Sequence, residues 1–326
     1  MKTWRTELIP QKAEFQISLA DAVFTIGSCF AQTMGNQLLS NKIKTQVNPF
    51  GTAYNPHCIH RLITSCLDKS PLEGSGILNR EGLFFHYDFH SQQSATTEEG
   101  LLKKLSKLHE DHSHNLKQAN VLIITYGTAF VYRRKDNQQI VSNCHKVPAS
   151  EFTKELLTVE EIIESFEKMH DALVNKNSTI KIILTVSPVR HTKDGLEQNT
   201  VSKSVLRLAC HQLAERKGVV YFPAYELMMD DLRDYRFYKT DRIHPTEEAE
   251  EYIWEKFMET YFNPETKKFF EEWQEIKLAL QHRPFHEHST AHQTFLKNTL
   301  SKLQKLSPKA DVSSEILELK SRLGHD

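Results

Sequence analysis

Two short motifs in this sequence combine residue types that together perform nucleophilic catalysis. The first, Gly27–Ala31, places Ser28 and Cys29 directly after a glycine, and the second contains Asp241 and His244, three positions apart. A thiol or hydroxyl becomes a nucleophile when an imidazole removes its proton and a carboxylate orients that imidazole. The two motifs therefore predict the two halves of a hydrolase-type catalytic site.

The first motif lies where a strand is expected to give way to a helix. Ala22–Ile26 is a short apolar run, and Phe30–Ser40 has a helix-like pattern. Gly27 allows a sharp turn between them, because glycine tolerates positive φ. Free N–H groups at a helix N-terminus stabilise a thiolate or a developing oxyanion. Since open-sheet sites lie beyond the carboxyl ends of the strands, we expect the site at this edge.

The wider pattern alternates strand-like and helix-like segments. The strand-like runs are 22–26, 121–125, 180–186 and 219–222, with a more polar one at 43–47. Helix-like stretches include 158–174, 201–217 and 246–261. This alternation predicts an α/β fold with a doubly wound parallel sheet.

Two further regions depart from the alternation. The segment from Phe130 to Val141 resembles a hairpin inserted after a sheet strand, and insertions of this kind often shape a substrate site. After Asn263 the strand runs stop, and the helix-like stretches are 267–280, 291–306 and 313–323. We therefore expect an α/β domain over 1–262 and a helical C-terminal extension over 263–326. That extension would pack on the core, on a partner or on a second copy in a homo-oligomer.

The composition excludes several classes of protein. Forty-one basic and 42 acidic residues leave a formal charge of −1, which argues against nucleic acid as a partner. No apolar run approaches the roughly 20 residues that span a bilayer, and the charged N-terminus does not resemble a secretory peptide. We therefore expect a cytoplasmic protein without a membrane partner. Five cysteines without close pairs predict neither a disulfide framework nor a metal site, and no motif calls for a cofactor.

The Gly27–Ala31 motif resembles the signature of the GSCFA family. Asn48–Pro56, Tyr126–Ala129 and Ser187–Arg190 are also similar to that family, and the resemblance covers roughly residues 2–300. The family in turn resembles the SGNH (GDSL-type) hydrolases. This resemblance implies a three-layer α/β/α fold with a five-stranded parallel sheet.

The resemblance also implies roles for individual residues. Cys29 takes the nucleophile position, although a shift of one residue would give that position to Ser28. We favour Cys29 because a thiol at a helix N-terminus is the better-activated group. His244 would be the base, oriented by Asp241, and Gly51 resembles the glycine whose N–H points into the oxyanion hole.

One block of the SGNH pattern is altered here. The pattern has Gly-x-Asn-Asp where this chain has Gly127–Phe130, so the asparagine that donates to the oxyanion is missing. Thr128, Asn48 and Asn55 are the candidates to replace it. Arg190 and His191 follow a strand-like run and are candidates for substrate binding.

Simpler explanations exist for these residues. Cys29 would also fit a buried structural thiol at a tight turn, and Asp241 would fit a cap on the following helix. Gly51 and Gly127 would also serve as ordinary turn glycines. Arg190 and His191 would equally fit a solvated loop.

The resemblance implies an acyl-ester hydrolase, an esterase or deacetylase that acts on small-molecule or carbohydrate-linked esters. The reaction would pass through a Cys/Ser-His-Asp covalent acyl-enzyme. One alternative is an acyltransferase that uses the same site with a donor such as acetyl-coenzyme A. Another is a non-catalytic binding protein on a degenerate hydrolase fold, which the missing asparagine and the long helical tail favour.

Overall fold

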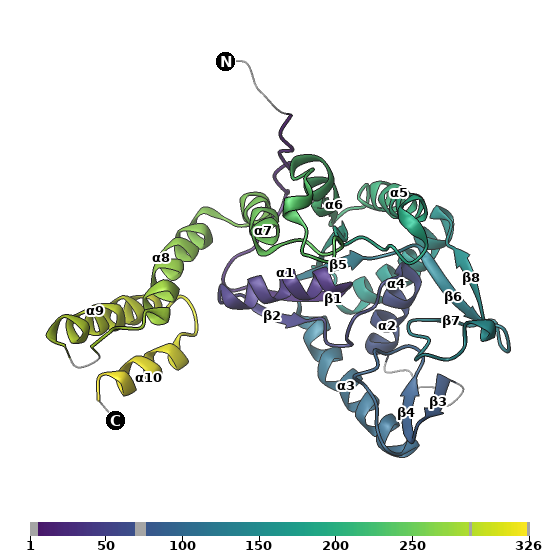
Figure 1. Cartoon of the computed structure of the whole chain (residues 1–326), viewed down its shortest axis with the longest axis horizontal. Helices are drawn as coiled ribbons and strands as arrows, with labels where there is room; N and C mark the ends of the chain where they lie inside the picture. Colours follow the sequence, from purple (N-terminus) through teal and green to yellow (C-terminus); the bar gives the residue numbers. More distant parts are fainter. Residues whose placement is uncertain (1–5, 69–75, 287–288, 325–326) are drawn as a thin grey trace.

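The structure is a computed structural model that describes residues 6–68, 76–286 and 289–324. Its centre is a five-stranded sheet in the order β2-β1-β5-β9-β10 (Figure 1). The strands are β1 (Ala22–Gly27), β2 (Lys44–Val47), β5 (Val121–Tyr126), β9 (Lys181–Val186) and β10 (Val219–Phe222). All neighbouring strands pair in parallel. Taken in chain order, this is the doubly wound order 2-1-3-4-5, and the predicted fold class is confirmed.

Helices cover both faces of the sheet and make three layers. On one face an apolar cluster joins the sheet to α2 (Pro56–Asp68), α3 (Glu98–Gln118), α4 (Val159–Lys176) and α5 (Gly195–Leu213). On the other face a second cluster joins it to α1 (Cys29–Ser40), α6 (Ala224–Glu226) and α7 (Glu247–Tyr261). Alternate side chains of β1 point to opposite faces of the sheet, so Phe24 belongs to the first cluster and Val23 to the second. Because both faces are covered, β1, β5, β9 and β10 are apolar along most of their length, whereas the edge strand β2 is mainly polar.

Two glycines let α1 follow β1 directly and lie close against the sheet. Gly27 has φ +137°, and a Cβ atom there would overlap the backbone of Thr125 on β5. At Gly35 a Cβ would collide with the side chains of Val47 and Thr25. The strand-to-helix turn therefore requires glycine at the first position, and close packing of α1 requires it at the second.

Antiparallel strands are inserted at the carboxyl edge of the sheet. The predicted hairpin is confirmed as β6 (Phe130–Arg134) and β7 (Ile140–Val141), and β8 (Phe152–Leu156) pairs with β6 on its other side. A second hairpin consists of β3 (Ile77–Arg80) and β4 (Leu83–His86). A π-helical turn, Leu227–Asp231, follows α6, and single 3₁₀ turns lie at Ala149–Glu151 and Tyr235–Phe237.

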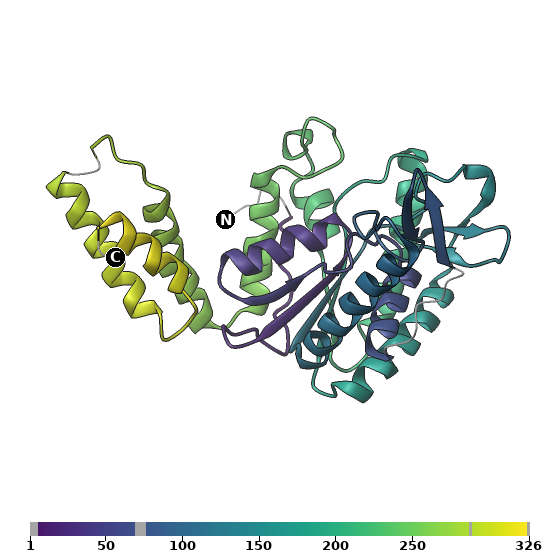
Figure 2. The same cartoon turned by 90° about the horizontal axis from the view of Figure 1, so that it is seen from below.

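Three helices form the C-terminal part of the chain: α8 (Pro264–Gln281), α9 (Thr290–Leu306) and α10 (Ser313–Arg322). They stand to one side of the α/β body in both views (Figures 1 and 2). Their apolar faces continue the cluster on the α1 side of the sheet. The Nε1–H of Trp273 also donates to the carbonyl of Ser40 at the end of α1 (2.7 Å). The expected helices are present, and a division into two domains at residue 263 stays a prediction.

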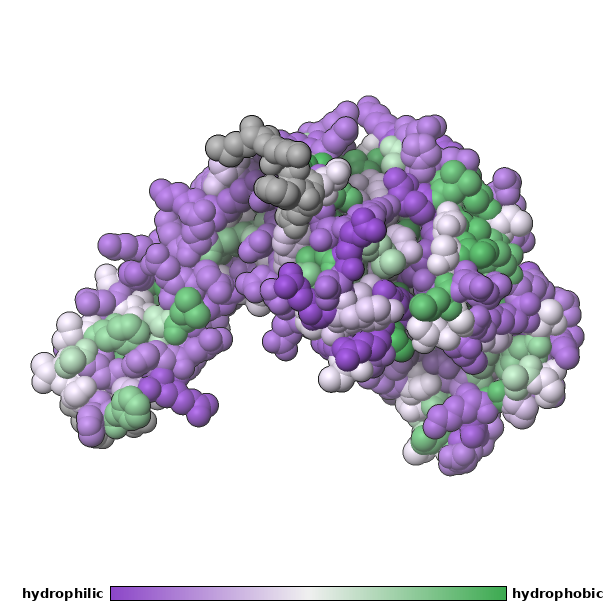
Figure 3. Space-filling view, turned by 45° about the horizontal axis from the view of Figure 1, so that its top comes forward, coloured by the Kyte–Doolittle hydropathy of each residue, from purple (hydrophilic) through white to green (hydrophobic). Residues whose placement is uncertain are grey.

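The face of the molecule drawn in Figure 3 is mainly polar. Figure 3 shows one face on which hydrophilic side chains predominate and apolar ones form small, separated patches. Within the described residues, no helix combines the length and the apolar character needed to cross a bilayer.

Candidate active site

Cys29 and Ser28 lie at the start of α1, at the carboxyl end of β1. Ser28 has the extended conformation of an N-cap (φ −65°, ψ 175°), yet its side chain makes no cap hydrogen bond. It is 1% exposed, and its Oγ has no hydrogen-bond partner among the described residues. Cys29, the first helical residue, is half-buried. Of the two, only the thiol is open to a reacting molecule.

The Cys29 thiol sits in the electrostatic field of a helix N-terminus. Burial raises its pKa above the ordinary value, while the Phe30 N–H and the charge of Lys203 act in the opposite direction. Its own backbone N–H also lowers the thiol pKa. These N–H groups point at the sulfur because the first helical turn has no carbonyl partners for them. The same donors would hold a negative oxygen bonded next to that sulfur.

Asn48 fixes the turn that presents the thiol. Its Oδ1 accepts from the Gly27 N–H (3.0 Å), and its Nδ2 donates to the Gly27 carbonyl (3.3 Å). The residue itself has φ +43°, a conformation that asparagine tolerates better than most residues. Both ends of its amide are therefore engaged in holding the turn.

Asp241 and His244 form a hydrogen-bonded pair in the loop before α7. Nδ1 of His244 lies 2.7 Å from Oδ2 of Asp241, and Oδ1 accepts from the N–H groups of Ile243 (2.8 Å) and His244 (3.0 Å). These hydrogen bonds hold the pKa of the Asp241 carboxyl well below its usual range. Because an ionised carboxylate only accepts, Nδ1 carries the proton and Nε2 is left as a base. Both side chains are nearly half exposed, at 44% and 45%.

Arg190 holds this loop against the end of β9. Its N–H donates to the Ile243 carbonyl (3.3 Å), and its guanidinium donates to the Arg242 carbonyl (3.4 Å). The guanidinium also lies 4.0 Å from the ring centre of Tyr238. Arg190 thus brings the Asp241–His244 pair to the edge of the sheet where β1 also ends.

Glu250 interacts with residues of both motifs. This residue, in the first turns of α7, interacts electrostatically with both Cys29 and His244. Its carboxylate accepts a hydrogen bond from Thr33, one helical turn beyond Cys29 on α1. Burial raises the pKa of Glu250 above its ordinary value. Among the described residues, however, no hydrogen bond joins His244 to Cys29 or to Ser28.

Gly127 lies against the nucleophile turn. A Cβ built on it would come within 3.3 Å of the Ser28 Cβ and within 3.0 Å of a Tyr54 ring carbon. Its N–H and that of Thr128 both donate to the Tyr54 carbonyl (2.7 and 3.1 Å). The Thr128 hydroxyl is paired with Ser202 (3.0 Å). The absence of a side chain at Gly127 therefore leaves space beside Ser28 and Tyr54. The Thr128 hydroxyl links the segment after β5 to α5 through Ser202.

The remaining predicted residues have structural partners. The Gly51 N–H donates to the Asn48 carbonyl (2.9 Å) within a tight turn. It therefore does not point into an oxyanion hole, as the resemblance implied. Asn55 accepts from the Cys58 N–H (2.8 Å) and caps α2. His191 donates its backbone N–H to Asn199 (2.9 Å), and burial lowers the pKa of its imidazole.

Two residues at this edge were not predicted, Lys203 and Glu250. Lys203 lies on the apolar stripe of α5 with Leu206 and Cys210, at helical spacing, and a lysine in that stripe is the signal that marks it in the sequence. Glu250 lies among several acidic residues at the start of α7, so nothing in the local pattern distinguishes it.

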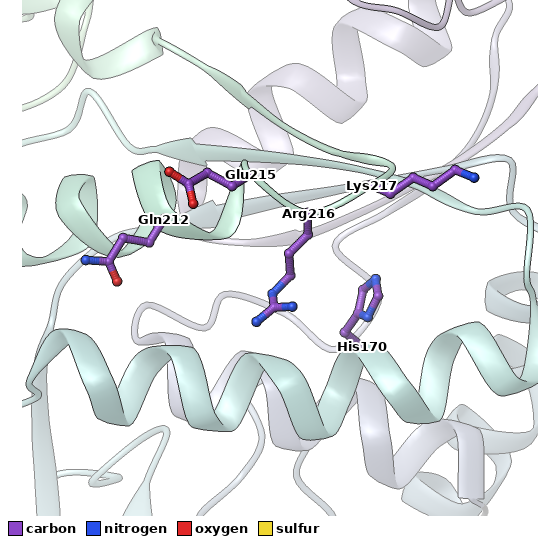
Figure 4. Close-up of a pocket in the computed structure, with 5 residues that line it drawn as sticks. All are labelled: His170, Gln212, Glu215, Arg216 and Lys217. Atoms are coloured by element: carbon purple, nitrogen blue, oxygen red, sulfur yellow. The ribbon is translucent and has the colours of Figure 1, made fainter.

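Two pockets on the α/β body are lined by residues of α4, α5 and α6. A pocket of 440 Å³ is lined by residues of α4, of the end of α5 and of the turn before β10, among them His170, Gln212 and Arg216 (Figure 4). It is at the amino ends of the strands, the edge opposite Cys29. A second pocket, of 430 Å³, lies between α5 and α6 and includes Lys203 and Tyr225 in its lining. Over the described ranges, no group of three or more His, Cys, Asp or Glu side chains could hold a metal ion.

Comparisons with known proteins agree with the motif that opens α1. Residues 22–257 match the GSCFA family, and residues 273–325 match the C-terminal domain of GSCFA domain proteins. No match was found among curated proteins. Among solved structures, the chain is similar to a carbohydrate esterase family 3 protein from Talaromyces cellulolyticus, with 10% identity, a TM-score of 0.35, and 77% of this chain and 99% of that chain covered. It is also similar to a mutant acetyl esterase with acetate ion, with 11% identity, a TM-score of 0.33, and 78% of this chain and 99% of that chain covered. The match over most of its length shows that the chain belongs to the GSCFA family.

Proposed function

We propose that this protein is an acyl-ester hydrolase that works through a covalent acyl-enzyme on Cys29. The observation that carries the proposal is the Asp241–His244 pair, whose imidazole has its Nε2 free among the described residues at the sheet edge where the Cys29 thiol opens α1. A nucleophile at a helix N-terminus and an oriented imidazole base are the two requirements of this chemistry.

Accessibility supports Cys29 over Ser28 as the nucleophile. The Ser28 hydroxyl is enclosed, with the residue 1% exposed, whereas the Cys29 side chain is half-buried and reaches the surface. A hydroxyl without a base beside it is also a weak nucleophile, whereas a thiol is intrinsically more reactive. Ser28 would instead shape the turn below the sulfur.

The reaction would proceed in two steps. Nε2 of His244 removes the proton of the Cys29 thiol as the sulfur attacks the ester carbonyl, and the N–H groups of Cys29 and Phe30 hold the oxyanion. The alcohol leaves with the proton from the imidazolium, and a thioester remains on Cys29. Water then attacks the thioester with His244 again as base, which releases the acid and restores the thiol.

This cycle requires Nε2 of His244 to come within hydrogen-bond distance of the Cys29 sulfur. No hydrogen bond joins His244 to Cys29 within the part of the chain that the structure describes. Catalytic hydrogen bonds are often long before substrate binds, and the His244 side chain is 45% exposed on the side of the site. A carbohydrate-linked acetyl group is the substrate class that the resemblance to SGNH hydrolases suggests.

A non-catalytic binding protein is the second candidate. The observations that favour it are that no hydrogen bond joins His244 to Cys29 among the described residues, and that Gly127–Phe130 lacks the asparagine of the SGNH pattern. Such a protein would keep the fold and bind an ester or a partner without turnover.

Hydrolysis of small acetyl esters by the full chain and by single variants tests the proposal. We expect Cys29→Ala and His244→Ala to lose turnover, while Ser28→Ala keeps much of it. Cys144→Ala is the matched control, because Cys144 is also half-buried but lies outside the site. Equal activity in the wild type and all four variants would show that these residues do not carry the reaction.

A further inference from the structure

Tyr54 is an exposed aromatic residue that the proposed mechanism does not use. The residue is 45% exposed, whereas its neighbours Ala53 and Asn55 are 1% and 5% exposed. An isolated exposed apolar side chain needs no explanation by itself. What distinguishes Tyr54 is that the segment around it is hydrogen-bonded to the turn that presents Cys29.

Backbone hydrogen bonds fix the Tyr54 segment to the turns that follow β1 and β5. The Ala53 N–H donates to the carbonyl of Gly27, in the nucleophile turn (3.0 Å). The Tyr54 carbonyl accepts from the N–H groups of Gly127 (2.7 Å) and Thr128 (3.1 Å). The backbone that carries the ring is therefore held in place before any substrate binds.

The Tyr54 ring lies beside the nucleophile turn. A Cβ atom built on Gly127 would be 3.0 Å from Cδ1 of Tyr54 and 3.3 Å from Cβ of Ser28. These two distances place one edge of the ring close to the residue that precedes Cys29. Any side chain at position 127 would fill the space between the ring and Ser28.

The Tyr54 ring is neutral and its face is open. Burial raises the pKa of the Tyr54 hydroxyl above its ordinary value, and the Cys29 thiolate acts in the same direction. Among the described residues, no other aromatic ring and no cation covers the Tyr54 ring. Tyrosine offers a large apolar face and loses little conformational entropy when that face is covered. A ring that is fixed and open in this way is suited to stacking.

We propose that Tyr54 determines substrate specificity: its ring stacks on the ring of the alcohol part in esters of ring-shaped alcohols. The inference deepens the proposed function and rests on it for the attack of Cys29 on an ester. A sugar ring and an aryl ring both present a flat apolar face to a tyrosine. Both therefore belong to the proposed substrate class, and a linear alkyl ester does not.

The test compares kcat/KM of the full chain for three acetyl esters. A monoacetylated methyl glucoside carries a sugar ring, phenyl acetate carries an aryl ring, and ethyl acetate carries no ring. Tyr54→Ala should lower kcat/KM about tenfold for a ring ester and less than about twofold for ethyl acetate, because only the ring ester loses a stacking partner. Each comparison uses one ester in two proteins, so differences between the leaving groups cancel.

Two further variants control this experiment. Tyr54→Phe should keep the wild-type preference, because it keeps the ring. Phe285→Ala is the matched control, since Phe285 is also an exposed aromatic residue but lies between α8 and α9. A loss for only one of the two ring esters identifies that ring as the one recognised. An equal effect of Tyr54→Ala on all three esters, or no effect on any, would overturn the proposal.

A second measurement requires no turnover. Cys29 is alkylated in a Cys144→Ala background by iodoacetamide and by its N-phenyl derivative, and in both reactions the sulfur displaces iodide. Tyr54→Ala should reduce the ratio of the N-phenyl rate to the iodoacetamide rate by about threefold or more, whereas Tyr54→Phe should keep it. An unchanged ratio in Tyr54→Ala would contradict stacking beside the thiol. A protein that hydrolyses no ester but keeps this ring preference is therefore distinguishable from an esterase without one.

Discussion

Nδ1 of His244 lies 2.7 Å from Oδ2 of Asp241, within a loop of five residues that begins with the aspartate and ends at Pro245. Arg242 between them has φ +60°, which tightens the turn. The other carboxylate oxygen is occupied by two backbone N–H groups. The aspartate therefore does two things: it shapes the loop and fixes the tautomer of the histidine.

Asp241→Asn should keep the loop but lose the correct tautomer. An asparagine oxygen can still accept from the backbone, whereas its amide no longer forces the proton onto Nδ1. We expect ester turnover to fall by about 10²- to 10⁴-fold, the usual worth of general base catalysis. Steady-state kinetics check this, with Asp234→Asn as the control, since Asp234 also caps a turn through its carboxylate. Unchanged turnover in Asp241→Asn would remove the aspartate from the mechanism.

Gly27→Ala should destabilise the fold strongly. Its φ of +137° is unfavourable for alanine, and the added Cβ would overlap the Thr125 carbonyl. Strain and overpacking together should lower the free energy of unfolding by about 3 kcal/mol or more. Gly82→Ala is the control, because Gly82 also has positive φ (+80°) but has nothing within 4 Å of a Cβ. Urea unfolding should show that Gly82→Ala lowers the free energy of unfolding by only about 1 kcal/mol. Equal decreases in Gly27→Ala and Gly82→Ala would refute the steric argument.

His60 should make the protein sensitive to acid. The imidazole is buried between the Tyr126 hydroxyl (2.6 Å) and the Ser165 hydroxyl (2.8 Å), and burial lowers its pKa to about 3. The unfolded chain has an ordinary histidine pKa of about 6.5, so below that pH it binds a proton that the folded chain does not. Stability should therefore be lost as the pH falls from about 6.5 towards 3.

Urea unfolding at several pH values measures this effect. As the pH falls, the free energy of unfolding should decrease less steeply in His60→Gln than in the wild type. The difference should be up to about 1.4 kcal/mol for each pH unit. His114→Gln, on the exposed side of α3, is the matched control and should follow the wild-type slope. A His60→Gln slope equal to that of the wild type would contradict the assignment.

Trp273 should anchor the C-terminal helices to the α/β body. The indole is 3% exposed, donates to the Ser40 carbonyl and lies 4.9 Å from the Lys42 ammonium. We expect Trp273→Ala to lower the free energy of unfolding by about 3–5 kcal/mol. Leu317→Ala, at a side chain 66% exposed, should change it by less than about 0.5 kcal/mol. A Trp273→Ala chain as stable as the wild type would show that this contact does not hold the helices.

The sheet could be predicted from the sequence because four of its five strands, β1, β5, β9 and β10, are short, mainly apolar runs, as expected of strands covered on both faces. The start of α5 could not. The pattern places the helix from Val201, whereas it begins at Gly195, because most residues of its first two turns are exposed and carry no apolar signal. Strand β8 was missed for a similar reason: Phe152–Leu156 contains two charged residues and only one buried side chain.

The site was predictable where its chemistry is local. Asp241 and His244 pair within one loop, so their spacing alone indicates the interaction. Lys203 reaches the site only because α5 crosses the ends of β5 and β9, and Glu250 only because α7 packs on α1. Contacts of this kind depend on the tertiary fold, which residue spacing does not encode.

The most direct measurement of the central claim is the location of the acyl group during turnover. The full chain is mixed with an acetyl ester, quenched in acid and digested, and its peptides are analysed by mass spectrometry. The account predicts one acetyl group on Cys29, released by hydroxylamine as a thioester and absent from Cys29→Ala. An acetyl group on Ser28 would contradict the account. So would hydrolysis of the ester by Cys29→Ala at the wild-type rate.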